Sequence, residues 1–162
     1  MSEKGKSPMS KLDEIDRKIL HLLQENSKVS VKEIADKLNL TKSPIYERMK
    51  RYEQDGIIDK YVAVLNTNKI DNVMIVFCSV CLESQRIEEI NKFKEAIGAI
   101  PEVAEGYLMG GSNDFLLKVI VKDLNAYHDF SSGKLAALPN VSQIKSTFVL
   151  NEIKRTSVIP VF

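Results

Sequence analysis

The sequence predicts an α+β protein in which a domain of three helices precedes a domain of alternating strands and helices. Three observations lead to this prediction. Apolar residues recur at helical spacing up to about residue 56, and strand-like apolar runs alternate with amphipathic segments beyond residue 73. A polar stretch at 66–72 separates the two parts. With 44% hydrophobic and 28% charged residues among 162, the composition is that of an ordinary globular protein.

The first helix is expected to begin at Ser10, which can cap it, and to end near Asn26, while residues 1–9 form a loose tail. Its apolar residues lie three and four positions apart, as on the buried face of an amphipathic helix. They are Leu12, Ile15, Ile19, Leu22 and Leu23.

A second helix is expected to begin at Ser30. Ser30 and Glu33 form a capping box, in which the two side chains bind backbone amides that the first turn leaves unpaired. Asn39 follows the apolar face of this helix, and asparagine tolerates the left-handed conformation with which a helix ends.

The third helix follows after a very short turn. Thr41 or Ser43 can cap it, and Pro44 fits its first turn because proline has no amide proton to lose there. Gly56 ends it, in a position where glycine accepts a positive φ. Two helices joined by so short a turn match the helix-turn-helix, whose second helix enters the DNA major groove. The alternative is a helical hairpin with a solvated charged face.

The net charge of +1 means that the chain is not a polycation, so binding to nucleic acid would depend on local placement of charge. The third helix supplies a local basic cluster, with Glu47 as its only acidic residue between positions 41 and 51. Residues expected at base edges are Lys42, Ser43, Tyr46, Glu47 and Arg48. Residues expected at phosphates are Thr41, Lys50 and Arg51.

Beyond Gly56, a short β-rich run at 60–65 is expected to form a strand or small wing. The sequence pattern of the second domain then predicts a βαββαβ order, which is the split βαβ arrangement of ferredoxin-like folds. Its helices cover one face of the sheet, and the open, partly apolar face is expected to support self-association. The expected strands are 73–83, 103–109, 115–121 and 142–150, and the helices are 86–99 and 123–138, the latter weakened by Gly133.

Cys78 and Cys81 form a C-x-x-C, which in other contexts indicates redox or metal chemistry. Here the pair lies within an expected strand, where this spacing sends the two side chains to opposite faces. Buried inert thiols are therefore expected, with no metal and no cofactor.

An enzyme is the first rival to a DNA-binding role, since His128 and Asp129 lie near Ser131. Consecutive residues do not face one another on a helix, so this group is not expected to form a catalytic site. The sequence therefore predicts no enzymatic activity. It has no apolar run of membrane-spanning length and no secretory signal, so a cytoplasmic protein without membrane contacts is expected.

Seven fragments, in this order and spacing, resemble the leucine-responsive regulatory protein and asparagine-operon regulator family, Lrp/AsnC. They are LDEIDRKIL at 12–20, NSKVS at 26–30, EIADKLNLT at 33–41, RMKRYEQDG at 48–56, IIDKYVAVL at 57–65, GGSNDFLLKV at 110–119 and VSQIKSTFVLNEIK at 141–154. The chain departs from the family at Asn39, Lys60 and Asp71, where glycine is frequent. Threonines are more usual near Ile144 and Ser146.

The resemblance implies a transcription regulator that binds double-stranded DNA, senses an amino acid or related metabolite, and forms a homodimer that assembles into tetramers or octamers. It implies a DNA-binding domain at 10–61, a strand and linker at 62–72, and an effector-binding and oligomerisation domain at 73–155. The effector residues that it implies are Met109, Gly110, Gly111, Asn113, Asp114 and Ser146.

The residues of the implied effector loop are compatible with a ligand. Amides around Gly110 and Gly111 can form a nest for a carboxylate, and Asp114 can accept hydrogen bonds from an ammonium group. The same residues are also what a hairpin turn requires. A second overall alternative is a small-molecule-binding oligomerisation module whose helical domain makes protein contacts.

Overall fold

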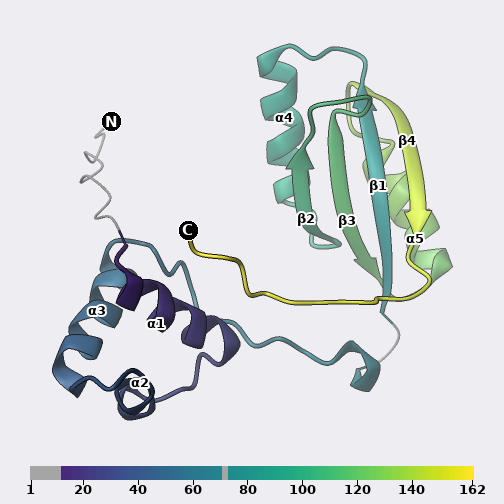
Figure 1. Cartoon of the computed structure of the whole chain (residues 1–162). Helices are drawn as coiled ribbons and strands as arrows, with labels where there is room; N and C mark the ends of the chain where they lie inside the picture. The colour runs from purple at the N-terminus through teal and green to yellow at the C-terminus, as the bar shows by residue number, and fades with distance from the viewer. Residues whose placement is uncertain (1–11, 71–72) are drawn as a thin grey trace. The chain divides into compact units, whose positions relative to one another are not determined.

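The computed structural model describes residues 12–70 and 73–162, and the chain divides into two compact units (Figure 1). One unit holds the described residues up to Val64 together with Lys154–Phe162. The other unit is Leu65–Ile153. None of the helices in the described part of the chain has the length and apolar character needed to cross a membrane.

The N-terminal unit contains the three predicted helices, α1 (Glu14–Glu25), α2 (Val31–Leu38) and α3 (Lys42–Gln54). The predicted start of the first helix is wrong, because α1 begins after Asp13; Ser10 itself lies outside the described residues. The carboxylate of Asp13 accepts the amide of Asp16 at 2.7 Å, and the amide of Asp13 donates to the Asp16 carboxylate at 2.9 Å. This reciprocal capping satisfies amides of the first turn and fixes the helix start.

The short turn between α2 and α3 has the predicted backbone. Asn39 has a φ of 53° and Gly56, after α3, a φ of 69°, so both residues take the left-handed conformation. Thr41 occupies the N-cap position of α3 without a side-chain capping bond, and Pro44 lies in the first turn. The three helices enclose a core of Ile19, Leu20, Leu23, Ile34, Ala35, Ile45 and Tyr52.

Residues 60–65 form no strand, so this prediction is wrong. The segment is extended, but no strand among the described residues pairs with it, and the side chains of Val62 and Val64 are 60% and 61% exposed. A single extended segment has no ladder hydrogen bonds to hold it, so high β propensity alone does not make a strand. A short 3-10 turn, Thr67–Lys69, follows it.

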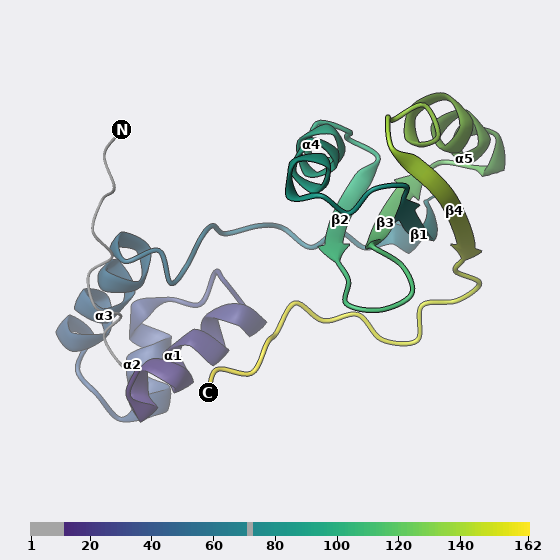
Figure 2. The same ribbon diagram turned by 90° about the horizontal axis from the view of Figure 1, so that it is seen from above.

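The C-terminal unit has the predicted βαββαβ order. Its strands β1 (Met74–Leu82), β2 (Val103–Leu108), β3 (Phe115–Val121) and β4 (Val141–Phe148) form one antiparallel sheet in the order β2-β3-β1-β4. The helices α4 (Ile87–Gly98) and α5 (Leu124–Phe130) both cover the same face (Figure 2). The other face of the sheet carries no helix of this unit.

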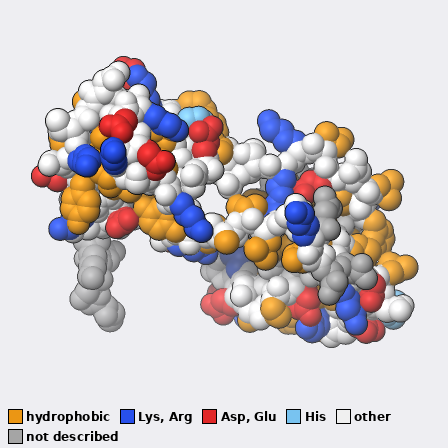
Figure 3. Space-filling model, turned by 90° about the horizontal axis from the view of Figure 1, so that it is seen from below, with side chains coloured by type: hydrophobic (Ala, Val, Ile, Leu, Met, Phe, Trp, Pro, Cys, Tyr) orange, Lys and Arg blue, Asp and Glu red, His pale blue; other side chains and the backbone are white. Residues whose placement is uncertain are grey.

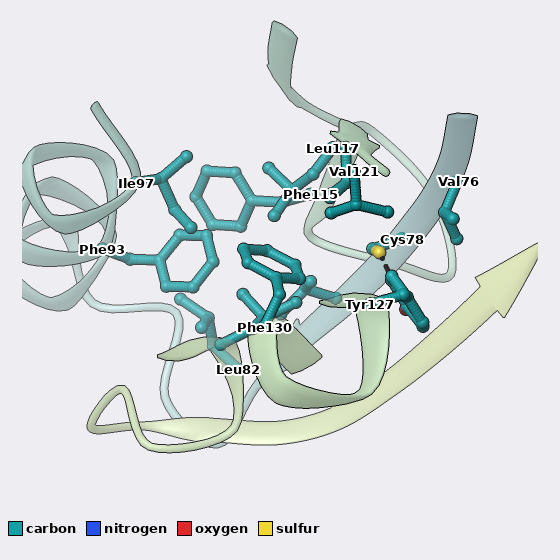
Figure 4. Close-up of a cluster of buried hydrophobic side chains, with 13 residues drawn as sticks. Val76, Cys78, Leu82, Phe93, Ile97, Phe115, Leu117, Val121, Tyr127 and Phe130 are labelled. Atoms are coloured by element: carbon teal, nitrogen blue, oxygen red, sulfur yellow. Dashed lines mark hydrogen bonds between the residues drawn. The ribbon is translucent and has the colours of Figure 1, made fainter. Parts of the chain in front are cut away.

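The core of this unit lies between the sheet and its two helices (Figure 4). Alternate residues of β1 point into it, and Phe93 of α4 stacks on Phe115 of β3 with ring centroids 4.5 Å apart. Cys78 is buried, with its Sγ 3.2 Å from the hydroxyl of Tyr127, and burial raises the pKa of its thiol. Both cysteines are free, but Cys81 is only half-buried, so the prediction of buried thiols is confirmed for Cys78 alone.

The predicted helix 123–138 is only partly confirmed, because α5 ends at Phe130 and a π-helical turn, Ser131–Leu135, follows. The hydroxyls of Ser131 and Ser132 donate to the carbonyl oxygen of His128 at 3.2 and 2.6 Å. These side chains compete for a carbonyl of the helix, and Gly133 adds backbone freedom, so the regular ladder is interrupted.

Candidate nucleic-acid interface and effector loop

The helix pair α2–α3 is set up by its own sequence. The hydroxyl of Ser30 accepts the amide of Glu33 at 3.2 Å, and the carboxylate of Glu33 accepts the amide of Ser30 at 2.7 Å. The hydrogen bond from this amide lowers the pKa of Glu33. After the left-handed residue Asn39, the amide of Leu40 donates to the carbonyl of Ala35 at 2.9 Å, which ends α2 and directs the chain into α3.

The outward face of α3 carries most of the side chains that the sequence predicts at DNA. Tyr46 is 60% exposed, and the other predicted residues on this face are exposed as well. They are Thr41, Lys42, Ser43, Glu47 and Lys50. On the surface visible in Figure 3, Lys and Arg side chains are interspersed with Asp and Glu. Because the net charge of the chain is only +1, binding to a polyanion would rely on this helix face and not on a large basic surface.

Arg48 and Arg51 lie differently, because both bind the carboxylate of Asp16 in α1. Nη1 of Arg48 is 2.5 Å and Nη2 of Arg51 is 2.7 Å from the same Asp16 oxygen. Arg48 also reaches the carboxylate of Asp13 at 2.7 Å, and the hydroxyl of Tyr52 donates to Asp16 at 2.6 Å. These contacts connect the start of α1 to the middle of α3.

The Asp16 side chain is only 2% exposed, so it is a buried carboxylate. Burial by itself raises its pKa, but the hydrogen bonds from Tyr52, the Asp13 amide and Arg48 outweigh burial and lower the pKa to about 2. Hydrogen bonds to Asp13 and Asp16 raise the pKa of Arg48. The group is therefore fully charged near neutral pH and holds the two helices together.

Asp16 is the residue that the sequence prediction missed. Its signal was present, since it lies between Ile15 and Ile19 and so falls partly on the apolar face of the helix. A carboxylate there needs cationic or hydroxyl partners when it is buried. Arg48 and Arg51, which lie about one turn apart on α3, were the available cations.

The predicted effector loop is the connection between β2 and β3. The amide of Met109 donates to the carbonyl of Asp114 at 2.8 Å, which closes the loop, and the amide of Asp114 donates to the carbonyl of Val80 at 3.0 Å. Gly110 and Gly111 are exposed, with open space where a Cβ would be. Among the described glycines, Gly56 is the one with a positive φ, so neither loop glycine is required by a left-handed backbone.

Asp114 braces this loop against the end of β1. One carboxylate oxygen accepts the amide of Leu82 and the other accepts the side-chain amide of Gln85, both at 2.7 Å. The Oδ1 of Asn113 lies 3.6 Å from the thiol of Cys81. The loop therefore has a fixed base, formed by Asp114, and an exposed rim.

Ser146 lies elsewhere in the sheet. Ser146 is on β4, where it pairs with Cys78 of β1. Its hydroxyl forms a hydrogen bond with the hydroxyl of Tyr127 on the helix-covered side of the sheet. Cys81, which contacts the loop, pairs instead with Gln143. One chain thus brings Met109, Gly110, Gly111, Asn113 and Asp114 together, and it does not bring Ser146 to them.

The open face of the sheet is a candidate interface with another copy. Apolar side chains on the side away from the helices come from its two central strands, and Ile120 among them is 37% exposed. They are Ile75, Phe77, Leu116 and Ile120. Lys118 forms an ion pair with Glu105 at 2.8 Å on this face.

The histidine considered for catalysis lies on the surface of α5. His128 and Asp129 are both exposed, with 3.9 Å between Nδ1 and Oδ1. The hydroxyl of Ser131 donates to the backbone of His128 and not to its ring. This arrangement does not activate a serine nucleophile.

Two family models match the chain along most of its length. Residues 12–59 match a model described as winged helix-turn-helix DNA-binding, and residues 75–159 match one described as the Lrp/AsnC ligand binding domain. The first match covers the three helices. The second covers the sheet, its helices, the loop after β2 and most of the C-terminal segment.

Curated relatives are similar over nearly their full length. The Bkd operon transcriptional regulator of Pseudomonas aeruginosa is 37% identical over 152 residues, which cover 94% of this chain and 99% of that protein. The leucine-responsive regulatory protein of Escherichia coli is 32% identical over 157 residues, covering 97% and 96%.

Solved structures show the same architecture. An AsnC family transcriptional regulator from Agrobacterium tumefaciens superposes with a TM-score of 0.85 at 37% identity, covering 92% of this chain and 97% of that one. A transcriptional regulator from Neisseria meningitidis, solved as a complex with L-Met, gives a TM-score of 0.85 at 32% identity, covering 92% and 96%.

Proposed function

The chain belongs to the Lrp/AsnC family of transcription regulators, and on this premise we propose that it binds double-stranded DNA through α3 and responds to an amino acid bound at the loop after β2. The observation that carries the DNA-binding role is the exposed face of α3, whose helix is held from behind by Asp16. A regulator of this kind acts where the DNA is, so the cytoplasmic location belongs to the same proposal.

The exposed residues of α3 divide into two groups, those that we place at bases and those that we place at phosphates. We place Lys42, Ser43, Tyr46 and Glu47 at base edges in the major groove, because they lie on the first two turns of the helix. Thr41 and Lys50 lie at phosphates. Arg48 and Arg51 bind Asp16, so they position α3, and they contact DNA only with the guanidinium nitrogens that this carboxylate leaves free.

The effector site uses the rim of the loop. We place an amino-acid carboxylate at the exposed amides of Gly110 and Gly111, with Met109 and Asn113 beside it. Asp114 already accepts from Leu82 and Gln85, so it acts first by fixing the loop and can offer only a remaining lone pair to an ammonium group. The solved L-Met complex of the Neisseria meningitidis relative supports an amino acid as the ligand class.

Ser146 lies apart from the effector loop within one chain. Ser146 faces away from the loop of its own chain, so any role of Ser146 in the effector pocket requires a shift of β4 or an indirect effect through Tyr127. We propose that the open face of the sheet forms a homodimer and that dimers associate into tetramers or octamers. Two copies of α3 in one dimer would then read half-sites about 34 Å, one helical turn, or a multiple apart.

The experiment that tests this function is a DNA-binding titration on duplexes selected from a random library. We expect specific binding. The logarithm of its binding constant should fall linearly with the logarithm of the salt concentration, because phosphate neutralisation releases counterions. The alternative, a helical domain that contacts protein, predicts no retention on DNA even at low salt. Addition of each of the twenty amino acids in turn should shift the midpoint of the titration for at least one of them.

A further inference from the structure

Residues 158–162 lie against α1 in the N-terminal unit, although they follow the last strand of the other unit, β4, in the chain. The side-chain amide of Gln24 bonds to the backbone of Ile159 in both directions. Its Nε2 donates to the carbonyl of Ile159 at 3.1 Å, and its Oε1 accepts the amide of Ile159 at 2.7 Å. A side chain that both donates and accepts in this way reproduces the pairing that a neighbouring β-strand would offer.

The contact uses one face of α1. Side chains three and four residues apart on this helix, ending with Gln24, meet the apolar residues Val158–Val161. Together they line a groove of about 540 Å³, to which α1 contributes Glu14, Arg17, Lys18 and His21. Val161 is half-buried against the apolar core of the N-terminal unit, whereas Phe162 is 94% exposed.

This face of α1 is separate from the residues that hold α3. Asp13 and Asp16 bind Arg48, and the groove is lined by their neighbours Glu14 and Arg17, which point to another side. Residues 158–162 can therefore dock on this face of α1 and leave it without breaking the contacts that orient α3.

We propose that residues 158–162 form a strap that docks reversibly on this face of α1 and gives the N-terminal domain a second attachment to the C-terminal domain. The chain leaves the N-terminal unit after Val64 and returns to it at Lys154, so docking closes a loop through the whole C-terminal unit. With the strap docked, the N-terminal domain is held by two connections. With the strap open, only the segment that follows Val64 holds it.

The small contact area makes the strap able to open. It consists of two hydrogen bonds with one glutamine and of two half-buried valines, Val158 and Val161. Residues 150–157 before it have no regular structure, and Leu150 and Ile153 are 98% and 94% exposed, so neither of these side chains packs against the described part of the chain. Tethering keeps the effective concentration of the strap high, which lets so small a contact stay populated.

Hydrogen exchange on the full-length chain tests the docking. We compare the wild type with Gln24→Ala and with Gln54→Ala, which removes an exposed glutamine at the end of α3. The Ile159 amide should exchange at least about tenfold faster in Gln24→Ala than in the other two proteins, since it loses its acceptor. Equal exchange in all three proteins overturns the strap.

A cross-link tests whether the strap binds its own chain. Gln24→Cys combined with Ile159→Cys, in a Cys81→Ser background, should form a disulfide within one chain under oxidation. Linkage between chains, seen as a dimer on a denaturing gel, overturns the intrachain strap and assigns this face of α1 to a second copy.

Small-angle scattering tests the second attachment. Gln24→Ala and Val161→Ala, the latter leaving α1 unchanged, should both increase the radius of gyration relative to Gln54→Ala. Equal radii in all variants overturn the tethering role. None of these measurements involves DNA or an effector, so their failure would leave the proposed function intact, and loss of DNA binding would not affect the strap.

Discussion

The carboxylate of Asp16 and the hydroxyl of Tyr52 lie 2.6 Å apart inside the N-terminal unit, with Tyr52 fully buried and the Asp16 side chain 2% exposed. The same oxygen of Asp16 binds Arg48 and Arg51. One carboxylate thus connects α1 to three residues of the helix that we place in DNA. The orientation of that helix depends on a charge that lies behind it.

Asp16→Asn should therefore destabilise the N-terminal domain. The substitution keeps the shape of the side chain but leaves two arginines beside a neutral group, and breaking a buried ion pair costs about 3 kcal/mol. The free energy of unfolding from urea titration at pH 7 measures this loss. Asp36→Asn, at an exposed position of α2, is the matched control and should change it by less than about 0.5 kcal/mol.

The contribution of Asp16 to the stability of the folded protein should decrease as the pH falls. Its pKa is lowered from 3.8 to about 2 in the folded protein, so its contribution is fully present above pH 4 and is lost as pH falls towards 2. The difference in unfolding free energy between the wild type and Asp16→Asn should shrink by about 2 kcal/mol between pH 5 and pH 2. A constant difference over this range would contradict the assigned pKa.

Lys50→Ala should weaken binding to all DNA sequences by similar factors. Lys50 is exposed on α3 and is placed at a phosphate, so its removal should reduce the slope of log affinity against log salt by about one. Tyr46→Ala, in contrast, should change sequence preference more than salt dependence. Lys122→Ala, which removes an exposed lysine after β3, is the charge-matched control; an equal loss there would show a general charge effect.

Asp114→Ala should abolish stabilisation by the effector amino acid while leaving DNA binding in its absence intact. The loop loses its anchors to Leu82 and Gln85, so its amides are no longer held in place. Thermal shift over the twenty amino acids measures this, because a ligand that binds the folded state raises Tm.

Gln85→Ala separates bracing from ligand contact. It removes one of the two bonds to Asp114 without altering the charge of the site. A partial loss of the thermal shift indicates that Asp114 acts by bracing the loop. A full shift in Gln85→Ala with none in Asp114→Ala indicates direct contact with the ligand, and a full shift in both removes Asp114 from the site.

Ile120→Lys should weaken dimerisation. Ile120 lies on the open face of the sheet, where a lysine would be desolvated in an interface without an acidic partner of its own. A loss of about 2 kcal/mol, or roughly thirtyfold in dissociation constant, is expected when an unpaired lysine is buried in such a surface. Mass photometry over a dilution series measures this. Leu124→Lys, at a 61% exposed position on the helix side, should leave the assembly unchanged.

The fold was largely predictable because its elements carry local signals. The capping box at Ser30, the left-handed residues Asn39 and Gly56, and the alternation along β1 act over a few residues, and each is confirmed. Predictions that depended on distant partners were less reliable. The run at 60–65 has strand-forming residues but no pairing strand, and the helix after Asp123 is interrupted by hydroxyls that bind the carbonyl of His128.

The sequence by itself determined most of the helices and strands, which faces are apolar and most of the exposed side chains of α3, since these follow from residue spacing and local hydrogen bonds. Only the tertiary structure decided the partners of the charged and polar groups. It placed Arg48 and Arg51 on Asp16, Ser146 beneath Tyr127 and Ile159 on Gln24. The physical reason is that a hydrogen bond depends on separations of about 3 Å, and chain segments up to 135 residues apart reach such separations only after the whole chain has packed.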